Sequence, residues 1–179
     1  MNDQIFSLQP FGKDPTLPNL EVIGTIARRD PFLLVQYTLL GEIDRVIVPA
    51  PNNKPTRKTE LWEQTCFEFF LSIRNSPAYW EFNLSPTGDW NIYRFEDYRQ
   101  GMQEETAYTE LPFSTETEAD AFSLSLRLDL DEIIPVGRVL DVGISAVTEL
   151  EGGKITHWAL KHPSTQADFH RRESFTLKL

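Results

Sequence analysis

Cysteine, methionine and histidine are all scarce in this sequence. Its 179 residues include one cysteine (Cys66), two methionines and three histidines. A single cysteine excludes an intrachain disulfide framework and a multi-cysteine metal site. No apolar run approaches the ~20 residues that a membrane-spanning helix needs. Basic residues are also few, 17 against 27 acidic residues, and the net charge of −10 disfavours binding to nucleic acid or to an anionic membrane surface.

The length and composition describe one folded domain covering residues 1–179. Apolar residues make up 40% of the chain and charged residues 25%, which is typical of a globular protein. The first 15 residues contain no basic segment followed by an apolar stretch, so no secretory signal is visible. Together with the lone cysteine, this predicts a cytoplasmic protein.

Apolar residues recur with period two along most of the chain, which predicts strands and almost no helix. Residues 96–120 are rich in Glu and Thr, and they predict a long acidic loop with at most a short helix. The predicted strands cover residues 21–28, 32–40, 46–48, 66–73, 79–85, 90–95, 121–129, 139–150 and 154–161, with a last strand at the C-terminus. Many short strands separated by turn signals predict an all-β fold, an antiparallel β-sandwich.

Strand alternation sorts the side chains of residues 66–95 into two faces. A two-residue turn at the PTGD segment would pair Ser85 with Trp90 and Glu81 with Arg94. One face is then an aromatic core, and we expect it to contain Phe67, Phe69, Leu71, Trp80, Phe82, Leu84, Tyr93 and Phe95. The other face gathers polar groups and an indole: Glu68, Glu81, Asn83, Ser85, Trp90 and Arg94.

This polar face suits a sugar, whose hydroxyls need planar hydrogen-bonding groups and whose ring needs an aromatic side chain to stack on. An ordinary solvated sheet face with a Glu81–Arg94 pair is the plainer interpretation.

The Gly152-Gly153 pair predicts a second hairpin. If these glycines are the two turn residues, Val147 pairs with Trp158, and both Trp158 and His162 stand away from the core. The small residues Gly143 and Ser145 beside them would then leave a groove. A bulge near the hairpin would instead turn Trp158 into the core.

Catalytic and metal sites are less well supported by the residues. Glu68 and Glu81 are acceptable as the carboxylate pair of a glycoside hydrolase, although two acids on neighbouring strands are more often a polar surface. His157 and His162 are five residues apart, so on one strand they lie on opposite faces and make a poor metal site. Haem would need one of the three histidines, with Met102 as its partner. The motifs therefore predict no metal and no cofactor.

Three segments resemble the DOMON-like domains related to type 9 carbohydrate-binding modules, in particular their stand-alone bacterial members. The segments are LWEQTCFEFFLSI, YWEFNLSPTGDWNIYRFEDYRQGM and THWALKHPSTQADFHRRESF, and the similarity extends from about residue 20 onward. The resemblance implies a jelly-roll-like β-sandwich that binds a ligand without chemistry. Its relatives bind sugars through a tryptophan clamp, often with structural calcium, and some bind haem through a Met and a His.

We therefore predict a non-catalytic domain that binds a glycan or another small molecule, carbohydrate first. Haem or a small apolar ligand is the first alternative, and a hydrolase is the second. His162-Pro163 should end a strand, and the following loop should bring Asp168 and His170 back toward the sheet. The resemblance places this loop near the ligand. The candidate binding residues are Trp62, Glu68, Glu81, Asn83, Trp90, Arg94, Trp158, His162, Asp168 and His170.

Overall fold

The computed structural model describes residues 3–179 as an antiparallel all-β fold with three short 3-10 helices. The 3-10 helices are η1 (Ile43–Arg45), η2 (Leu61–Glu63) and η3 (Arg172–Ser174). The strands are β1 (Gln4–Pro10), β2 (Leu20–Arg29), β3 (Phe32–Gly41), β4 (Cys66–Ile73), β5 (Tyr79–Leu84), β6 (Trp90–Phe95), β7 (Gln103–Glu104), β8 (Phe113–Thr117), β9 (Ala121–Asp129), β10 (Leu140–Glu149), β11 (Ile155–Ala159) and β12 (Leu177–Lys178). No helix within residues 3–179 has the length and apolar character to cross a membrane.

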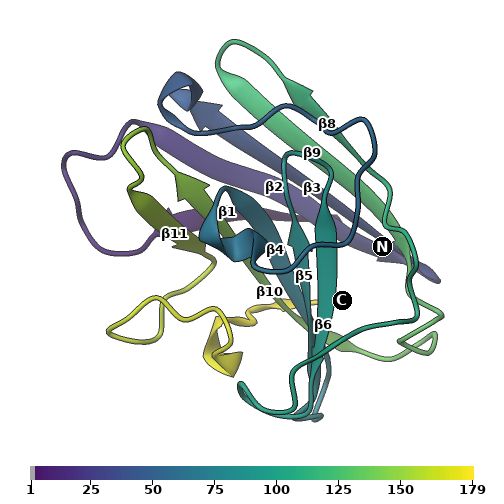
Figure 1. Ribbon diagram of the computed structural model, residues 1–179. Coiled ribbons are helices and arrows are strands. Elements are labelled where there is room, and N and C mark those ends of the chain that lie inside the picture. The colour runs from purple at the N-terminus through teal and green to yellow at the C-terminus, as the bar shows by residue number, and fades with distance from the viewer. Residues whose placement is uncertain (1–2) are drawn as a thin grey trace.

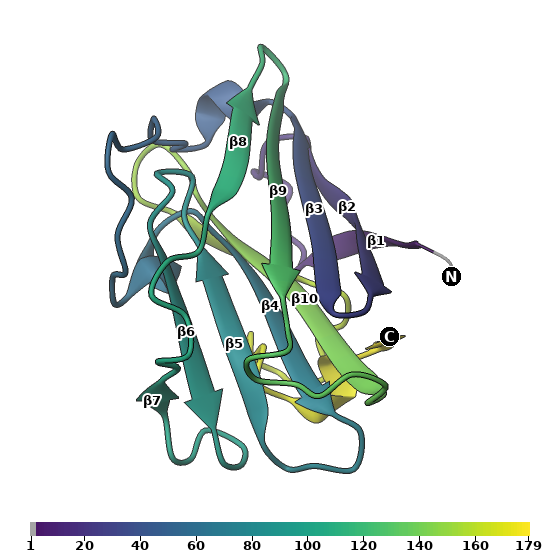
Figure 2. The same ribbon diagram turned by 90° about the vertical axis from the view of Figure 1, so that its right-hand side faces the viewer.

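The strands form two layers that are joined through β1 (Figures 1 and 2). One layer has the order β1-β2-β3-β9-β8, and the other has the order β7-β6-β5-β4-β10-β11, with β12 paired to β10. The first part of β1 pairs with β2, while Gln9 and Pro10 pair with β11, so this strand closes one side of the sandwich. The predicted β-sandwich is confirmed.

The main core fills the space between the layers. Strands β4 and β5 contribute six residues on their inner face, as predicted from alternation: Phe67, Phe69, Leu71, Trp80, Phe82 and Leu84. Phe69 and Phe82 are directly opposite each other and stack with ring centroids 4.3 Å apart. Apolar residues of β2, β3 and β9 pack against them from the other layer.

A second, smaller core lies on the outer face of β4, β5 and β6, where the sequence predicted a polar surface. It consists of Phe70, Tyr79, Tyr93, Phe95 and Phe175, with Trp62 and Phe169 packed against it. The C-terminal segment, yellow in Figure 1, lies on this side of the layer and supplies Phe169 and Phe175. Because both faces are covered, every residue of β5 is buried.

The predicted register of the β5–β6 hairpin was wrong by one residue. The loop has three residues, Pro86 to Gly88, because Ser85 N–H bonds the Asp89 carbonyl and Gly88 N–H bonds the Ser85 carbonyl. Gly88 takes a left-handed φ of 88°, the conformation that a three-residue hairpin loop requires. Leu84 therefore pairs with Trp90, which turns Trp90 and Ile92 into the main core and Tyr93 and Phe95 to the outer face.

The β10–β11 hairpin deviates from the prediction in the same way. Its loop is Glu151 to Gly153, closed by the Leu150 N–H to Lys154 carbonyl bond, and Val147 pairs with His157. Trp158 is consequently buried in the main core, where its Nε1 donates to Thr148 Oγ1 at 2.9 Å. The expected groove beside Gly143 is absent, because the Phe175 ring lies directly over this glycine.

Several element boundaries also differ from the predictions. Residues 46–48 form only an isolated bridge at Val46. Residues 4–10 and 113–117 are additional strands. The acidic segment 96–120, all of which the structure describes, has no helix. The last strand is only Leu177–Lys178, because the N–H groups of Phe175 and Thr176 bond carbonyl oxygens of η3 (Arg172 and Ser174) and not a neighbouring strand.

Replacing Phe82 by alanine tests the inner face. Phe82 is fully buried against Phe69, so we expect Phe82→Ala to lower the free energy of unfolding by ~3–5 kcal/mol in urea titrations. Ile5→Ala is the control, because Ile5 is 81% exposed and should change stability little. A loss at Phe82 no larger than that at Ile5 would contradict the assignment of the core.

Candidate ligand-binding pocket

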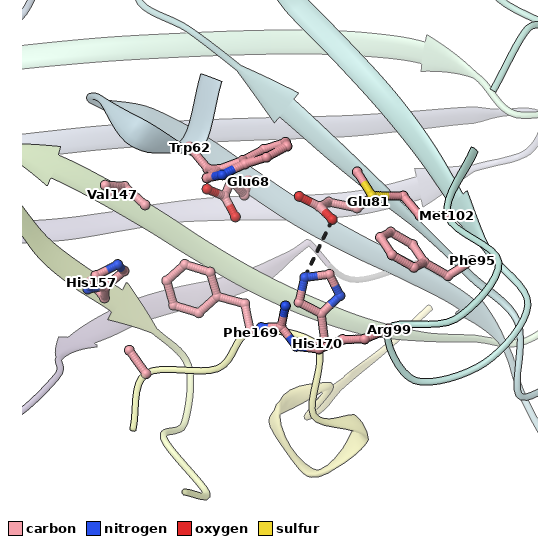
Figure 3. A pocket seen from close by; sticks show the side chains of 11 residues that line it. Trp62, Glu68, Glu81, Phe95, Arg99, Met102, Val147, His157, Phe169 and His170 are labelled. Carbon is pink, nitrogen blue, oxygen red and sulfur yellow. Dashed lines mark ion pairs between the residues drawn. The ribbon is translucent and has the colours of Figure 1, made fainter. Parts of the chain in front are cut away.

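A pocket of about 320 Å³ opens on the outer face of the second layer, between β4, β5, β10, η2 and the C-terminal segment (Figure 3). Its lining comes from seven separate parts of the chain: η2, β4, β5, β6 with the loop after it, β10, β11 and the C-terminal segment. The lining residues are Trp62, Glu68, Glu81, Phe95, Arg99, Met102, Val147, His157, Ala167, Phe169 and His170. This volume is at the lower end of the range of about 300–1,000 Å³ that small-molecule sites occupy.

Two carboxyl groups, Glu68 on β4 and Glu81 on β5, project into this pocket (Figure 3). They stand diagonally across the two paired strands, since Glu68 faces Asn83 and Phe70 faces Glu81. The two residues are only 2% and 4% exposed. Their face is the one predicted from strand alternation, but the C-terminal segment and η2 have removed it from bulk water.

Burial raises the pKa of both carboxyl groups. For Glu81 the pKa rises to about 7, and a hydrogen bond from Asn83 Nδ2 to Oε1 at 2.9 Å and the nearby Arg99 limit the rise. For Glu68 burial and the neighbouring Glu81 charge raise the pKa well above its ordinary value of 4.5. Ser145 Oγ, 3.5 Å from Oε2, is its one hydrogen-bond partner, while Oε1 is buried with none.

A chain of hydrogen bonds positions the ring of His170. The Arg99 backbone N–H donates to Tyr79 Oη at 3.1 Å, and Tyr79 Oη lies 2.8 Å from His170 Nδ1. The other ring nitrogen, Nε2, lies 3.6 Å from Glu81 Oε2 (dashed in Figure 3). Burial, with Arg99 nearby, lowers the pKa of His170 to about 4, so the ring is neutral at pH 7.

Asp168 fixes the C-terminal segment over the pocket. Its Oδ1 accepts from Arg99 Nη2 at 3.0 Å and from the His170 N–H at 3.1 Å, and its Oδ2 accepts from Tyr98 Oη at 2.5 Å. Burial alone raises the pKa of Asp168, but the hydrogen bonds from Tyr98 and Arg99 outweigh it and keep the pKa below the ordinary value. Asp168 is thus an ionised anchor that positions His170 and Arg99.

Aromatic rings form the walls. Trp62 stands on η2 and meets Tyr93 edge to face at 5.7 Å, and Phe169 packs against His157 at 5.8 Å. Phe95 stacks on Tyr79 at 4.8 Å. Trp62 is half-buried, so part of its indole is available to a ligand.

The structure brings together some of the ten residues predicted from the sequence and separates others. Trp62, Glu68, Glu81 and His170 line the pocket, while Asn83 and Asp168 support lining residues. Asp168 and His170 lie on a loop that returns to the sheet, as predicted, at the end where Trp62 lies. Contact of any of these residues with a ligand stays a prediction.

Four predicted residues lie outside the pocket. Trp90 and Trp158 are buried in the main core through the register changes, and Arg57 covers the Trp90 ring at 4.3 Å. Arg94 is exposed and shares the inner-face parity of Trp90, opposite Trp80. His162 lies at the β1–β11 corner, where Nε2 is 2.8 Å from the Gln9 carbonyl oxygen.

The lining includes residues that the sequence analysis did not select. His157 and Phe95 face the pocket because of the same register changes that removed Trp158 and Trp90. Arg99 has a left-handed φ of 52°, which directs its N–H to Tyr79. No strand periodicity covers Arg99 or Phe169, so only the resemblance of the DFH segment hinted at the latter.

The pocket does not fit the calcium that the resemblance allowed. Within residues 3–179, no group of three or more His, Cys, Asp or Glu side chains is arranged to hold a metal ion. Calcium prefers six to eight oxygen ligands. Of the two histidines in the lining, His170 is not free to hold haem, because its Nδ1 is hydrogen-bonded to Tyr79 and its Nε2 faces Glu81.

Solved structures show the same fold. A candidate carbohydrate-binding protein from Bacteroides uniformis matches with a TM-score of 0.68 and 14% identity over 98% of this chain and 85% of its own. A type 9 carbohydrate-binding module from Caldicellulosiruptor kristjanssonii matches in its glucose complex (TM-score 0.53, 13% identity, 92% of this chain and 78% of its own). Its cellotriose complex matches with a TM-score of 0.55 and 12% identity, over 91% and 75% of the two chains. The chain has the fold of type 9 carbohydrate-binding modules. No protein-family model matches its sequence, and no curated protein does.

The buried carboxyl group of Glu68 leads to a prediction about stability and pH. Because its pKa is raised in the folded protein, the stability associated with its protonated form is complete below pH 4.5 and is lost as the pH rises through the folded-state pKa. Glu68→Gln keeps the size and shape of the side chain but removes the carboxyl group that can ionise. We expect it to match the native protein at pH 5 and to be more stable at pH 8, by on the order of 1–3 kcal/mol.

Thermal denaturation of both proteins at the two pH values measures this difference, since ~1 kcal/mol moves the melting temperature by ~2–4 °C in a chain of this size. Glu116→Gln, at an exposed position on β8, controls for the change in net charge. Equal melting temperatures for Glu68→Gln and the native protein at pH 8 would show that Glu68 carries no burial penalty.

Proposed function

We propose that this chain is a non-catalytic carbohydrate-binding module that holds a sugar residue in the pocket on its outer face. The observation that carries the proposal is the pairing of aromatic walls with buried, incompletely hydrogen-bonded carboxyl groups in one cavity of about 320 Å³. A sugar ring presents an apolar C–H face and a rim of hydroxyls, and these two surfaces match the two kinds of side chain.

Specific side chains would take each part of the sugar. Trp62, with its half-exposed indole, is the plate for the ring face. Glu68 Oε1 has no partner and can accept from a hydroxyl, and the part-exposed Arg99 can donate. Two or three such bonds and one stacked ring suffice for millimolar to micromolar affinity, roughly −4 to −8 kcal/mol.

The similarity in fold to a type 9 carbohydrate-binding module is a second support for the proposed carbohydrate binding. The module from Caldicellulosiruptor kristjanssonii has been solved with glucose and with cellotriose. At 12–13% identity the fold alone is shared, so the sugar and its contacts have to be established for this chain. The closer relationship to DOMON-like domains, which the sequence motifs indicate, stays a prediction.

A glycoside hydrolase is the alternative that the Glu68–Glu81 pair favours. A retaining or inverting glycosidase needs one ionised carboxylate and one protonated acid. Burial raises both pKa values, so they do not separate the two functions. The binding modules among the structures of the same fold favour the non-catalytic proposal. We expect no release of nitrophenol from nitrophenyl glycosides; turnover that is lost in Glu68→Gln and in Glu81→Gln would establish the enzyme instead.

Calorimetric titration with a panel of neutral and amino sugars and short glucans tests the proposal. Trp62→Ala should weaken binding about tenfold or more, as expected for the loss of a stacked ring, and should reduce stability only slightly. Trp158→Phe is the matched control: this indole is buried in the main core, so stability should fall while affinity stays constant.

Two outcomes would contradict the proposal. One is a native protein that binds no member of the panel at millimolar concentration. The other is an affinity that Trp62→Ala leaves unchanged.

A further inference from the structure

The pocket contains two carboxyl groups and no cation that is free to pair with them. Arg99 is committed to Asp168, 3.0 Å away. His170 is neutral at pH 7, and burial together with His162 lowers the pKa of His157. The pocket lining contains no lysine. Within residues 3–179, an ionised carboxylate here therefore has only the charge of Arg99, which is shared with Asp168.

Glu68 is the less satisfied of the two groups. Its Oε1 is buried without a partner, and Oε2 has only the long 3.5 Å contact to Ser145 Oγ. A buried carboxyl oxygen without a donor costs free energy, and the cost falls when a bound ligand supplies one. Because Glu68 projects into the pocket, the missing donor can come from a ligand (Figure 3).

The aromatic walls add a second preference for positive charge. Trp62, Phe95 and Phe169 surround the space into which both carboxyl groups point (Figure 3). Aromatic faces attract ammonium groups at distances within ~6 Å, and more strongly where water is excluded. Rings and carboxylates therefore favour the same kind of ligand group.

A divalent metal ion fits this set of groups less well than an ammonium does. A metal would need further oxygen or nitrogen ligands, and residues 3–179 offer no cluster of three acidic, histidine or cysteine side chains for it. An alkyl ammonium needs only hydrogen-bond acceptors and apolar contact for its carbon skeleton, and the pocket provides both.

We propose that the pocket recognises a primary ammonium group, held between Glu68 and Glu81, and that its ligand is an amino sugar. This inference rests on the proposed carbohydrate function for the sugar part of the ligand and on the carboxyl pair for the ammonium. The ammonium supplies the donor that Glu68 lacks, and the ring lies against Trp62.

Proton release should accompany binding. The groups that lie around the carboxyl pair are Cys66 on β4, Asn83 on β5, Tyr93 on β6, Ser145 on β10, His157 on β11, His170 with Tyr79 behind it, and Arg99 in the loop after β6. None of these supplies a free cation, so the pair holds protons in the empty pocket. An arriving ammonium favours the ionised form, and the displaced proton goes to solvent.

The decisive experiment compares two ligand pairs that differ only in ammonium against hydroxyl. Glucosamine is titrated against glucose, and cyclohexylammonium against cyclohexanol, at pH 6.5 and in a buffer that contains a chelator. We expect glucosamine to bind about tenfold or more tightly than glucose, because hydrogen bonds to charged groups are the stronger ones. Affinity for the amines should rise between pH 5 and pH 6.5, and affinity for the neutral ligands should not.

Two variants test whether Glu68 causes the preference for the ammonium ligand. Glu68→Gln should remove most of the preference for glucosamine over glucose and reduce proton release, measured by calorimetry in buffers of different ionisation enthalpy. Glu116→Gln removes the same charge from an exposed position on β8 and should leave both quantities unchanged.

Each outcome separates this inference from the proposed function. Glucose binding as tightly as glucosamine overturns ammonium recognition and leaves carbohydrate binding standing. Cyclohexylammonium binding as tightly as glucosamine, with glucose much weaker, supports ammonium recognition and removes the sugar from the proposal. The absence of binding by all four ligands overturns both.

Discussion

The cover that residues 160–176 place over the outer face of β4, β5 and β10 is the contact on which the pocket depends. Without it, Glu68 and Glu81 would be solvated side chains on an open sheet, with ordinary acidity. With it, Phe70 and Tyr79 become a second core, closed by Phe175. Asp168 ties the cover to the loop after β6 through Arg99 and Tyr98. The same segment thus creates the pocket and removes water from the carboxyl groups.

Gly143 shows how closely this cover depends on the sheet beneath it. A Cβ at this position would lie 2.8 Å from the Phe175 ring, so the aromatic side chain can reach the backbone of β10 only over a glycine. Sequence reasoning identified the small residues at 143 and 145 as the floor of an open groove. The structure instead has Phe175 over Gly143 and the Glu68 carboxylate beside Ser145.

The fold and half of the site could be predicted from period-two alternation, and the errors in the rest have one physical origin. Both hairpins use a three-residue loop with glycine at positive φ, at Gly88 and at Gly153, where a two-residue turn was expected. One extra loop residue moves every later side chain of the strand to the other face. Hence the predicted Trp90 and Trp158 are in the core, and Phe95 and His157 face the pocket.

Residues before the loops, such as Glu68 and Glu81, were unaffected. Arg99 and Phe169 could not be found in this way, because no alternation describes a loop.

The carboxyl groups also illustrate why a binding site reduces the stability of the protein that carries it. Apolar side chains at 68 and 81 would suit this doubly covered sheet, yet the sequence has two glutamates there. One of them, Glu68, has an oxygen that no group within residues 3–179 satisfies. Aromatic residues on both faces of β4 and β5 stabilise the layer enough to tolerate this cost. A ligand that provides the missing donor and charge recovers that free energy on binding, because the pocket loses none by reorganising: Asp168 and Tyr79 already hold Arg99 and His170 in place. The polar pair is therefore costly in the empty protein, and in the proposed complex it would favour a ligand that carries the missing donor over one that does not.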